Sequence, residues 1–182
     1  MLNLLRYTTV LLLIGRAYEH IRWIGPYRDF FYNPIGFGKW YAEFIGRDLK
    51  DIYNDTFYES LLSSISSGIG VVFILGAIVV LFYEKLYRFK WVIYLVLVFL
   101  FTTYMGYFMA KHFKMWGMLL EHALQFVTPI LFMFFYKNEQ NRVLYIGVWA
   151  SALTFYCHGL FAMGYYPQPG KFVDMVIAST GL

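Results

Sequence analysis

The chain has 182 residues, of which 60% are hydrophobic, 23% aromatic and only 14% charged, and its mean hydropathy is +0.54. These values are too apolar for a soluble domain of this length, so the composition predicts a membrane protein. The net charge is +4, but Lys and Arg are scattered through short loops without forming a basic stripe, which argues against nucleic-acid binding. A single cysteine, Cys157, excludes an intrachain disulfide and a paired-thiol redox motif.

Five apolar segments are long enough to cross a hydrocarbon core of about 30 Å as helices. They comprise residues 3–23, 60–83, 91–110, 116–136 and 143–164. The segments are too long for barrel strands and lack their alternation, and most connections are short enough to make neighbouring helices antiparallel. The sequence therefore predicts an all-α membrane protein, an up-down bundle of about five transmembrane helices. We expect the first helix to be retained, because no small-residue cleavage site follows it.

The first segment carries three ionisable residues, Arg16, Glu19 and His20, near one end. An insertion cost of about 2.5 to 3.5 kcal/mol for a charge at mid-bilayer means that such residues need partners. Spacings of three and four residues place them on one helical face and allow Arg16 to pair with Glu19. This face is expected to meet protein or water.

A long polar stretch, residues 25–59, separates the first two segments. In its second half Trp40 and Phe44 alternate with Glu43 and Arg47 in a pattern that predicts a short helix on the membrane surface. The stretch also concentrates aromatic residues among Gly and Pro: Phe30, Phe31, Tyr32, Phe37, Trp40, Tyr41 and Phe44. So much aromatic surface predicts that residues 26–56 fold back on the bundle.

The fourth segment has a polar stripe, which is expected to face the first helix. Its members are Glu121, His122, Gln125 and Thr128. The spacing of four and seven residues puts Glu121, Gln125 and Thr128 on one helical face, so that Glu121 is a second possible partner for Arg16. Pro129 lacks an N–H and predicts a kink.

The fifth segment carries a row of small and polar residues, Gly147, Ser151, Thr154 and His158. Aligning residues 11–31 with 153–173 sets Arg16 against His158 and, after a gap, Pro26 against Pro169. This internal echo predicts that the fifth helix opens a second copy of a four-helix unit. We accordingly divide the chain into residues 1–140, a four-helix unit with a long first loop, and 141–182, a fifth helix with an interfacial tail. The row is expected to contact the first four helices or a second polypeptide.

Seven polar residues are candidates for one intramembrane ion-pair or ligand pocket: Arg16, Glu19, His20, Glu121, His122, Gln125 and His158. Three interpretations stay open. The residues form a structural ion pair that fixes helix register; they bind an anionic or quinone-like headgroup and relay protons to it; or two histidines, such as His122 and His158, ligate a b-type haem. No other metal site and no hydrolase constellation is predicted, and whether the chain catalyses a reaction stays open.

Three stretches carry a resemblance to a known family: LIGRAYEHIRWIGPYRDFFYN, LLEHALQFVTPILF and CHGLFAMGYYPQPGKFVDM. They resemble the DoxX-like membrane proteins, a superfamily of four-helix units that includes the related HTTM domains. Some members are membrane subunits of redox systems such as thiosulfate:quinone oxidoreductase. The resemblance implies an accessory or redox-associated subunit of a larger membrane complex, with a quinone- or haem-binding electron-transfer protein as the alternative. The long first loop and the fifth helix depart from the simplest members.

The distribution of Lys and Arg bears on orientation. One side of the predicted bundle holds Arg6, Lys85, Arg88, Lys90, Lys137 and Arg142, and three of these fall within residues 84–90. Concentration of positive charge in a short loop favours the cytoplasmic side. We expect a multi-pass protein of the inner (cytoplasmic) membrane with its N-terminus inside, in contact with lipid and with other subunits or further copies of itself.

Overall fold

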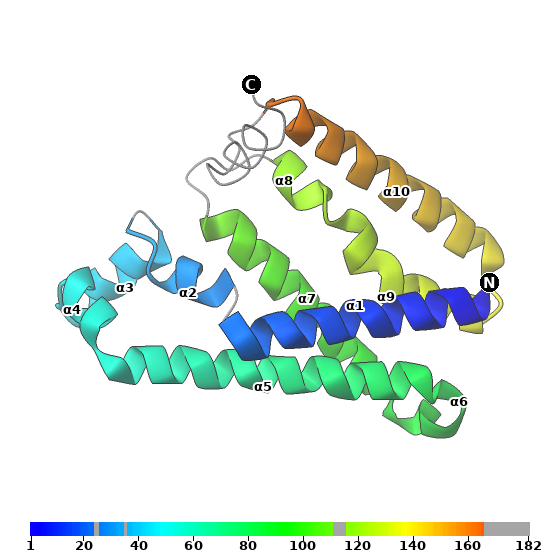
Figure 1. Cartoon of the computed structure of the whole chain (residues 1–182), viewed down its shortest axis with the longest axis horizontal. Coiled ribbons are helices and arrows are strands. Elements are labelled where there is room, and N and C mark those ends of the chain that lie inside the picture. The colour runs from blue at the N-terminus through cyan, green and yellow to red at the C-terminus, as the bar shows by residue number, and fades with distance from the viewer. Residues whose placement is uncertain (24–25, 35, 111–115, 166–182) are drawn as a thin grey trace, which may run out of the picture.

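The computed structural model describes residues 1–23, 26–34, 36–110 and 116–165, and within these ranges the chain forms helices and no strand (Figure 1). The helices are α1 (Leu2–Trp23), α2 (Pro26–Phe31), α3 (Phe37–Ile45), α4 (Leu49–Asn54), α5 (Thr56–Leu81), α6 (Tyr83–Leu86), the 3₁₀ turn η1 (Tyr87–Phe89), α7 (Trp91–Ala110), α8 (Trp116–Leu120), α9 (Ala123–Tyr136) and α10 (Gln140–Ala162). The all-α prediction is confirmed for the described residues.

Two long helices, α1 and α5, form an antiparallel pair along the length of the molecule (Figure 1). Their close approach depends on Gly70, where a Cβ atom would lie 2.6 Å from Cγ1 of Ile21 and 3.1 Å from the carbonyl oxygen of Ala17. On another face of α5, a Cβ at Gly76 would lie 2.4 Å from Cγ2 of Val96 in α7. Small residues thus set the spacing of both contacts, as in other membrane helices.

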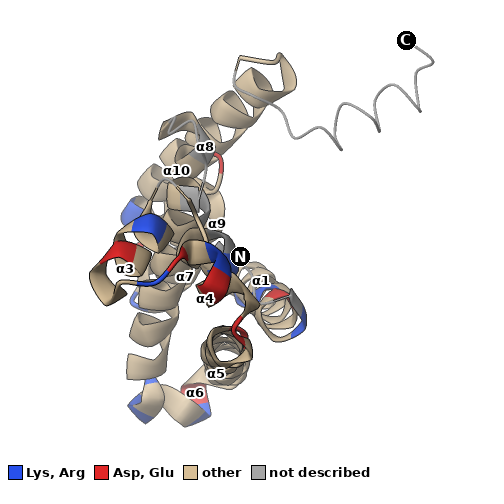
Figure 2. Cartoon of the chain, turned by 90° about the vertical axis from the view of Figure 1, so that its left-hand side faces the viewer, with Lys and Arg blue, Asp and Glu red and all other residues tan. Residues whose placement is uncertain are grey.

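The remaining long helices, α7, α9 and α10, run obliquely across this pair (Figures 1 and 2). Successive long helices still alternate in direction, because α9 and α10 pack together as an antiparallel pair and α9 also contacts α1. The arrangement is therefore two crossed groups of helices, whereas the short connections alone suggest one aligned bundle.

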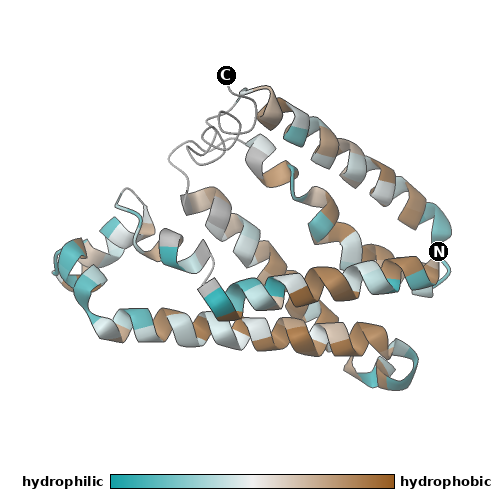
Figure 3. Cartoon of the chain, viewed as in Figure 1, coloured by the Kyte–Doolittle hydropathy of each residue, from teal (hydrophilic) through white to brown (hydrophobic). Residues whose placement is uncertain are grey.

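The core lies where these groups meet. Its fully buried members include Leu13 of α1, Phe73 of α5, Ile93 and Leu100 of α7, and Phe132 of α9. The middle of α5 and most of α7 and α9 are apolar, whereas the C-terminal part of α1 is polar (Figure 3). A polar segment is thus held inside an apolar assembly.

Two described helices, α5 and α10, are long and apolar enough to cross a membrane, and α7 becomes a third if it is joined with residues 83–89 across a bend of 79°. The number is smaller than the five predicted from segment length. Every 18-residue window of α1 includes at least three charged residues from Arg6, Arg16, Glu19 and Arg22. The described helices therefore have the composition of a membrane-associated protein, with two or three helices that are long and apolar enough to cross a membrane.

The predicted fourth segment is not one helix. It divides into α8 and α9, with a turn at Glu121 and His122 between them. Only α9 is left as an apolar helix, and it has 14 residues. Pro129 lies within α9 and does not interrupt it. The break thus occurs at the two ionisable residues, which the sequence analysis placed inside one continuous helix, and the kink at Pro129 stays a prediction.

Residues 26–34 and 36–55 form the compact helical segment α2–α4 beside the bundle (Figure 1). The segment folds back as predicted, since α2 contacts α7 and the amide of Asn33 donates to the carbonyl oxygen of Met109 over 3.3 Å. Aromatic rings join its parts: Phe31 contacts Phe37, Tyr41 and Tyr58. The predicted short helix is α3, on which Trp40 and Phe44 stack and are 57% and 75% exposed.

Charged residues lie on α3 and α4 and around α6, and others lie on α1 (Figure 2). Arg6 of α1 pairs with Glu84 of α6, which fixes the start of α1 against the end of α5. At the opposite end Arg47 pairs with Asp55, the residue that caps α5, over 3.0 Å. The apolar helix α5 therefore runs between two charged regions, the distribution expected of a helix that crosses a bilayer.

Candidate functional site

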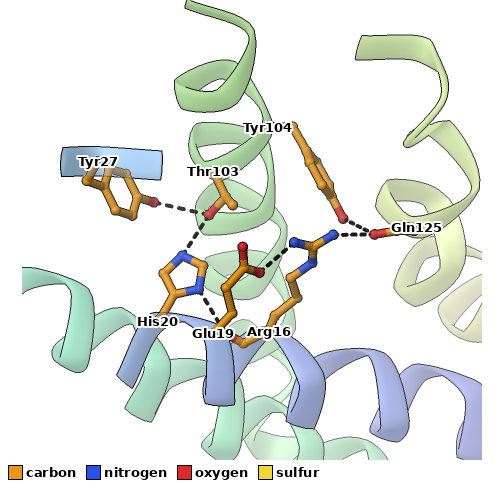
Figure 4. A network of polar contacts seen from close by, with 7 residues as sticks. All are labelled: Arg16, Glu19, His20, Tyr27, Thr103, Tyr104 and Gln125. Atoms are coloured by element: carbon orange, nitrogen blue, oxygen red, sulfur yellow. Dashed lines mark hydrogen bonds and ion pairs between the residues drawn. The ribbon is translucent and has the colours of Figure 1, made fainter. Parts of the chain in front are cut away.

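The polar end of α1 contacts α9 through Arg16 (Figure 4). The Nη1 atom of Arg16 lies 2.6 Å from Oε2 of Glu19, the pairing that the spacing of three residues predicts. Its Nη2 atom donates to Oε1 of Gln125, and the hydroxyl of Tyr104 donates to the same oxygen over 2.9 Å. The guanidinium also lies 5.1 Å from the centre of the Tyr104 ring, a cation–π contact. One arginine thereby joins α1, α7 and α9.

His20 occupies a separate position on the same helix. It is 1% exposed, and its Nδ1 atom lies 2.8 Å from the carbonyl oxygen of Arg16. A carbonyl only accepts, so Nδ1 carries a proton, and in a neutral ring Nε2 accepts from the Thr103 hydroxyl over 3.1 Å. The oxygen of Thr103 then accepts from the hydroxyl of Tyr27 at 3.2 Å. This chain of bonds connects α2 to the interior (Figure 4).

The backbone of this part of α1 is also bonded to α5. Ser66, which is fully buried, donates to the carbonyl oxygen of His20 over 2.8 Å. The Ser and Gly residues that begin α5 therefore supply a hydrogen bond as well as close packing. Because the aromatic rings of Tyr27 and Phe73 contact the His20 ring edge-on, the imidazole is fixed in one orientation.

A third group of polar residues surrounds the turn between α8 and α9. The two oxygens of Glu121 face two histidines: Oε1 lies 3.5 Å from Nε2 of His122, and Oε2 lies 3.9 Å from Nδ1 of His158. The His122 ring stacks on Tyr104 at 5.1 Å between centroids, which links this group to the Arg16 contacts. We refer to Glu121, His122 and His158 as the carboxylate–imidazole cluster.

The start of α9 is fixed by α10. The backbone N–H of Leu124, one of the four N-terminal donors that no intrahelical acceptor satisfies, donates to the Thr154 hydroxyl over 3.0 Å. The Thr128 hydroxyl, one turn further along α9, donates to the carbonyl oxygen of Leu124. A side chain from the next helix thus substitutes for the missing local cap and stabilises the break.

The seven predicted site residues fall into three groups in space. Arg16, Glu19 and Gln125 form one hydrogen-bonded group; His20 belongs to the Thr103 chain; and the other three form the carboxylate–imidazole cluster. Gln125 faces α1 as predicted, but Arg16 takes Glu19 as its carboxylate partner and Glu121 turns to the histidines. That these residues bind a ligand stays a prediction.

Three residues that the sequence analysis did not select join these groups: Tyr27, Thr103 and Tyr104. Two of them belong to the polar triplet Thr102–Tyr104, which interrupts an otherwise apolar helix and was a visible signal. Tyr27 had no such signal, because it lies in a loop-like stretch already rich in aromatic residues.

The depth of the groups follows from helix geometry. Arg16 lies seven residues before the end of α1, and Tyr104 lies six residues before the end of α7. At about 1.5 Å per residue, both lie about 10 Å inside the ends of their helices. This depth corresponds to the boundary between headgroups and acyl chains when the helix ends lie at the membrane surface, which is where ionisable groups cost less than at mid-bilayer.

The geometry of the described residues does not favour a metal or haem site. The described residues contain no group of three or more His, Cys, Asp or Glu side chains placed to hold a metal ion. A haem with two axial histidines needs two imidazoles opposed across the iron, whereas the nearer nitrogens of His122 and His158 both face one carboxylate. This arrangement of the two histidines does not fit the haem alternative.

A cavity of about 450 Å³ lies outside the polar groups, in the α2–α4 segment, where it is lined by Tyr32, Pro34, Asp48, Leu49, Lys50, Tyr53 and Asn54. The side chains around Arg16 instead bond one another. The polar groups therefore have partners within the chain, as buried polar atoms require.

Comparison of the chain with protein-family models, with curated proteins and with solved structures finds no match. The functional argument consequently depends on the residues and their geometry.

Proposed function

We propose that this chain is an accessory integral membrane subunit, of the DoxX-like type that its sequence resembles, within a larger and redox-associated membrane complex. The observation that carries the proposal is the outward face of α10. Only 17% of the apolar window of α10 is buried within the chain, compared with 44% for α5. Of the two helices that are long and apolar enough to cross a membrane, α10 is therefore the one less covered by its own chain.

The exposed face of α10 has a specific composition. Tyr145, Trp149 and Tyr156 are spaced by four and seven residues, so they form one stripe, and they are 68%, 57% and 68% exposed. The row that contains Thr154 and His158 points to the opposite side and contacts α8 and α9. Large aromatic residues are enriched at protein interfaces, because each provides much contact area with little loss of side-chain entropy. We refer to Tyr145, Trp149 and Tyr156 as the aromatic stripe.

The polar row of α10 does not itself need a second polypeptide. Thr154 caps α9, His158 contacts Glu121, and Leu131 of α9 would lie 3.7 Å from a Cβ atom placed on Gly147. The row contacts earlier residues of its own chain, one of the two outcomes that the sequence predicts, so the support for a partner subunit is the aromatic stripe.

The interior contacts suit a structural role for the polar groups. The charges of Arg16 and Glu19 compensate one another, and the hydrogen bonds to Gln125 and Thr103 hold α1 against α9 and α7. Because the Arg16–Glu19 pair lies within α1, the register of α1 against α9 depends on the bond from Arg16 to Gln125. An accessory subunit needs such a rigid scaffold to present α10.

Site-directed cross-linking tests the proposal. In a Cys157→Ser background, Trp149→Cys places a thiol on the aromatic stripe. The control is Ile74→Cys, because the side chain of Ile74 on α5 is 40% exposed. We expect a membrane-permeant bis-maleimide to join position 149 to a second polypeptide in native membranes, with much less product from position 74. Equal or absent cross-linking at the two positions would contradict a subunit interface on α10.

A second candidate function, binding of a quinone headgroup, is favoured by the contact between His122 and Tyr104. Reduction of a quinone takes up protons, and here a hydroxyl, an imidazole and the Glu121 carboxylate lie together at headgroup depth. Mass spectrometry of lipids extracted from the purified protein, together with its absorption spectrum, separates the candidates. A stoichiometric quinone supports this function, a Soret band supports haem, and phospholipid alone supports neither.

A further inference from the structure

The net charge of the chain is unevenly distributed. Nine of its cations are matched in number by nine carboxylates, and the imbalance lies in the start of α1, in residues 82–91 and in residues 136–142. These segments hold six cations and only two carboxylates, Glu84 and Glu139. The cations are Arg6, Lys85, Arg88, Lys90, Lys137 and Arg142. The three segments therefore carry all of the net charge of +4.

Two of these six cations are neutralised within the chain. Arg6 pairs with Glu84, and the Nη1 atom of Arg142 lies 2.6 Å from Oε2 of Glu139. The other four are exposed and form no ion pair with a carboxylate in the described part of the chain: Lys85, Arg88, Lys90 and Lys137. We refer to these four residues as the basic surface.

Packing of tyrosine rings brings the two parts of the basic surface together. Tyr83, which is 2% exposed, contacts the rings of Tyr87 and Tyr136 with centroid distances of 5.5 and 4.6 Å. These contacts hold the α6–η1 turn against the end of α9, so that Lys137, the residue after Tyr136, lies near the turn. The Nζ atom of Lys90 lies 4.7 Å from the centre of the Tyr87 ring. The four charges thus share one packed support.

The direction of α6 and η1 suits the surface of a membrane. Residues 83–89 and 91–106 meet at a bend of 79°. When α7 crosses the bilayer, the preceding segment therefore runs nearly parallel to the membrane surface. Phe82, Tyr87 and Trp91, in and beside this segment, are 49%, 44% and 54% exposed. Exposed aromatic and basic side chains occur together at the boundary between acyl chains and headgroups.

We propose that the basic surface binds the phosphate groups of anionic phospholipids, so that the chain selects these lipids in the leaflet that contacts α6 and η1. Charge complementarity identifies this occupant, because clusters of about four to eight Lys and Arg residues beside a membrane-spanning helix attract anionic lipid. Ammonium and guanidinium groups also donate strong hydrogen bonds to phosphate oxygens. The inference requires that α7 cross a membrane, as the proposed function does, but it needs no partner subunit.

Lipid binding by the full chain tests the inference. The chain is purified in a neutral detergent and titrated with phosphatidylglycerol or with phosphatidylcholine of the same acyl chains, and native mass spectrometry counts the bound lipids. We expect the unaltered chain to prefer phosphatidylglycerol. Changing Lys85, Arg88 and Lys90 together to Gln should lower the affinity for phosphatidylglycerol about 100-fold, or about fivefold for each cation at an anionic surface, and leave phosphatidylcholine binding unchanged.

Two further triple variants separate the basic surface from charge in general. Arg22, Lys39 and Lys50 are exposed cations in the charge-balanced part of the chain, and changing all three to Gln lowers the net charge by the same amount. This variant should retain the preference for phosphatidylglycerol. The combination of Lys85→Arg, Arg88→Lys and Lys90→Arg keeps the charges and should retain it too, which shows that the Gln variant acts through charge and not through packing.

A fluorescence measurement locates the bound lipid. Trp91 follows Lys90 directly and is exposed. In vesicles that contain equal mole fractions of brominated lipid, brominated phosphatidylglycerol should quench the tryptophan fluorescence more than brominated phosphatidylcholine does. Trp91→Phe should remove most of this difference, whereas Trp149→Phe on α10 should leave it unchanged.

The outcomes decide separate parts of the inference. Equal affinity of the unaltered chain for the two lipids overturns the lipid site, including the case in which the basic surface binds an acidic protein instead. Equal losses in the two Gln variants, or a quenching difference that does not depend on Trp91, overturn its location. Absence of a cross-link at position 149 contradicts the subunit proposal alone, so the two proposals fail independently.

Discussion

The Arg16 guanidinium on α1 donates to the side-chain oxygen of Gln125 on α9, although the two residues lie 109 positions apart. The same oxygen accepts from Tyr104, so that one amide oxygen connects three helices. Glu19 balances the charge locally. A guanidinium that costs several kcal/mol when it is unpaired in a membrane is thereby made part of the helix packing.

The first prediction concerns this amide. Gln125→Leu removes the acceptor but retains an apolar side chain of similar size, and we expect a loss of about 1.5 to 3 kcal/mol, as for a hydrogen bond to a charged group. Reversible unfolding in mixed detergent micelles measures the change. Gln140→Leu at the exposed start of α10 is the control and should have little effect. Equal stability of the two variants would show that the contact between α1 and α9 does not stabilise the fold.

A second prediction distinguishes the two carboxylates that the sequence offers to Arg16. Because Glu19 is the partner, Glu19→Gln leaves the guanidinium without its counter-charge and should cost about 3 kcal/mol. Glu121→Gln should cost clearly less, since its carboxylate faces His122 and His158. The same unfolding measurement applies to both. A larger loss of stability in Glu121→Gln than in Glu19→Gln would show that Glu121, and not Glu19, neutralises the charge of Arg16.

A third prediction tests the spacing of α1 and α5. Gly70→Ala puts a methyl group against Ile21 and the Ala17 carbonyl and should destabilise the fold by about 1 to 3 kcal/mol, as overpacking does. Gly68→Ala, two residues earlier on the same helix, has nothing within 4 Å of the new Cβ. It should be neutral or stabilising by up to about 1 kcal/mol through helix propensity. Equal changes in stability for Gly70→Ala and Gly68→Ala would contradict the close approach of α1 and α5 at Gly70.

A fourth prediction concerns pH at the start of α5. The backbone N–H of Phe57 and then the Arg47 guanidinium hold the pKa of Asp55 below its ordinary value of 3.8. The cap is therefore fully present above that value and is lost as the pH falls through the lowered pKa. Hydrogen exchange of the Phe57 amide, corrected for its intrinsic rate, should stay slow from pH 7 to about pH 4. Asp55→Ala should lose this protection at every pH, whereas Asp51→Ala should retain it.

Much of the helical pattern could be predicted from the sequence, because long apolar runs determine it. The predicted segment 91–110 coincides with α7, and the pairing of Arg16 with Glu19 follows from their spacing. The short helix α3 follows from the alternation of Trp40 and Phe44 with charged residues. In each case the information lies within a few turns of one helix.

Other features depend on contacts that a local pattern does not contain. The break before α9 is stabilised by the Thr154 hydroxyl from the next helix, and no local pattern around residues 121–122 contains that contact. Glu121 appeared to lie on the stripe that faces α1 because a continuous helix was assumed. Tyr27 reaches Thr103 only because α2 folds back onto α7, a contact between residues 76 positions apart. The oblique crossing of the two helix groups likewise arises from packing between distant segments.

The central claim, that the chain works as a subunit, is tested most directly by native mass spectrometry after extraction from its own membrane into lipid nanodiscs. The account predicts an assembly that contains the 21.5 kDa chain and at least one more polypeptide, either a second copy or another protein. It also predicts that changing Tyr145, Trp149 and Tyr156 together to Ala releases the chain from the assembly. A single chain with lipid alone, under conditions that preserve other membrane complexes, would contradict the account.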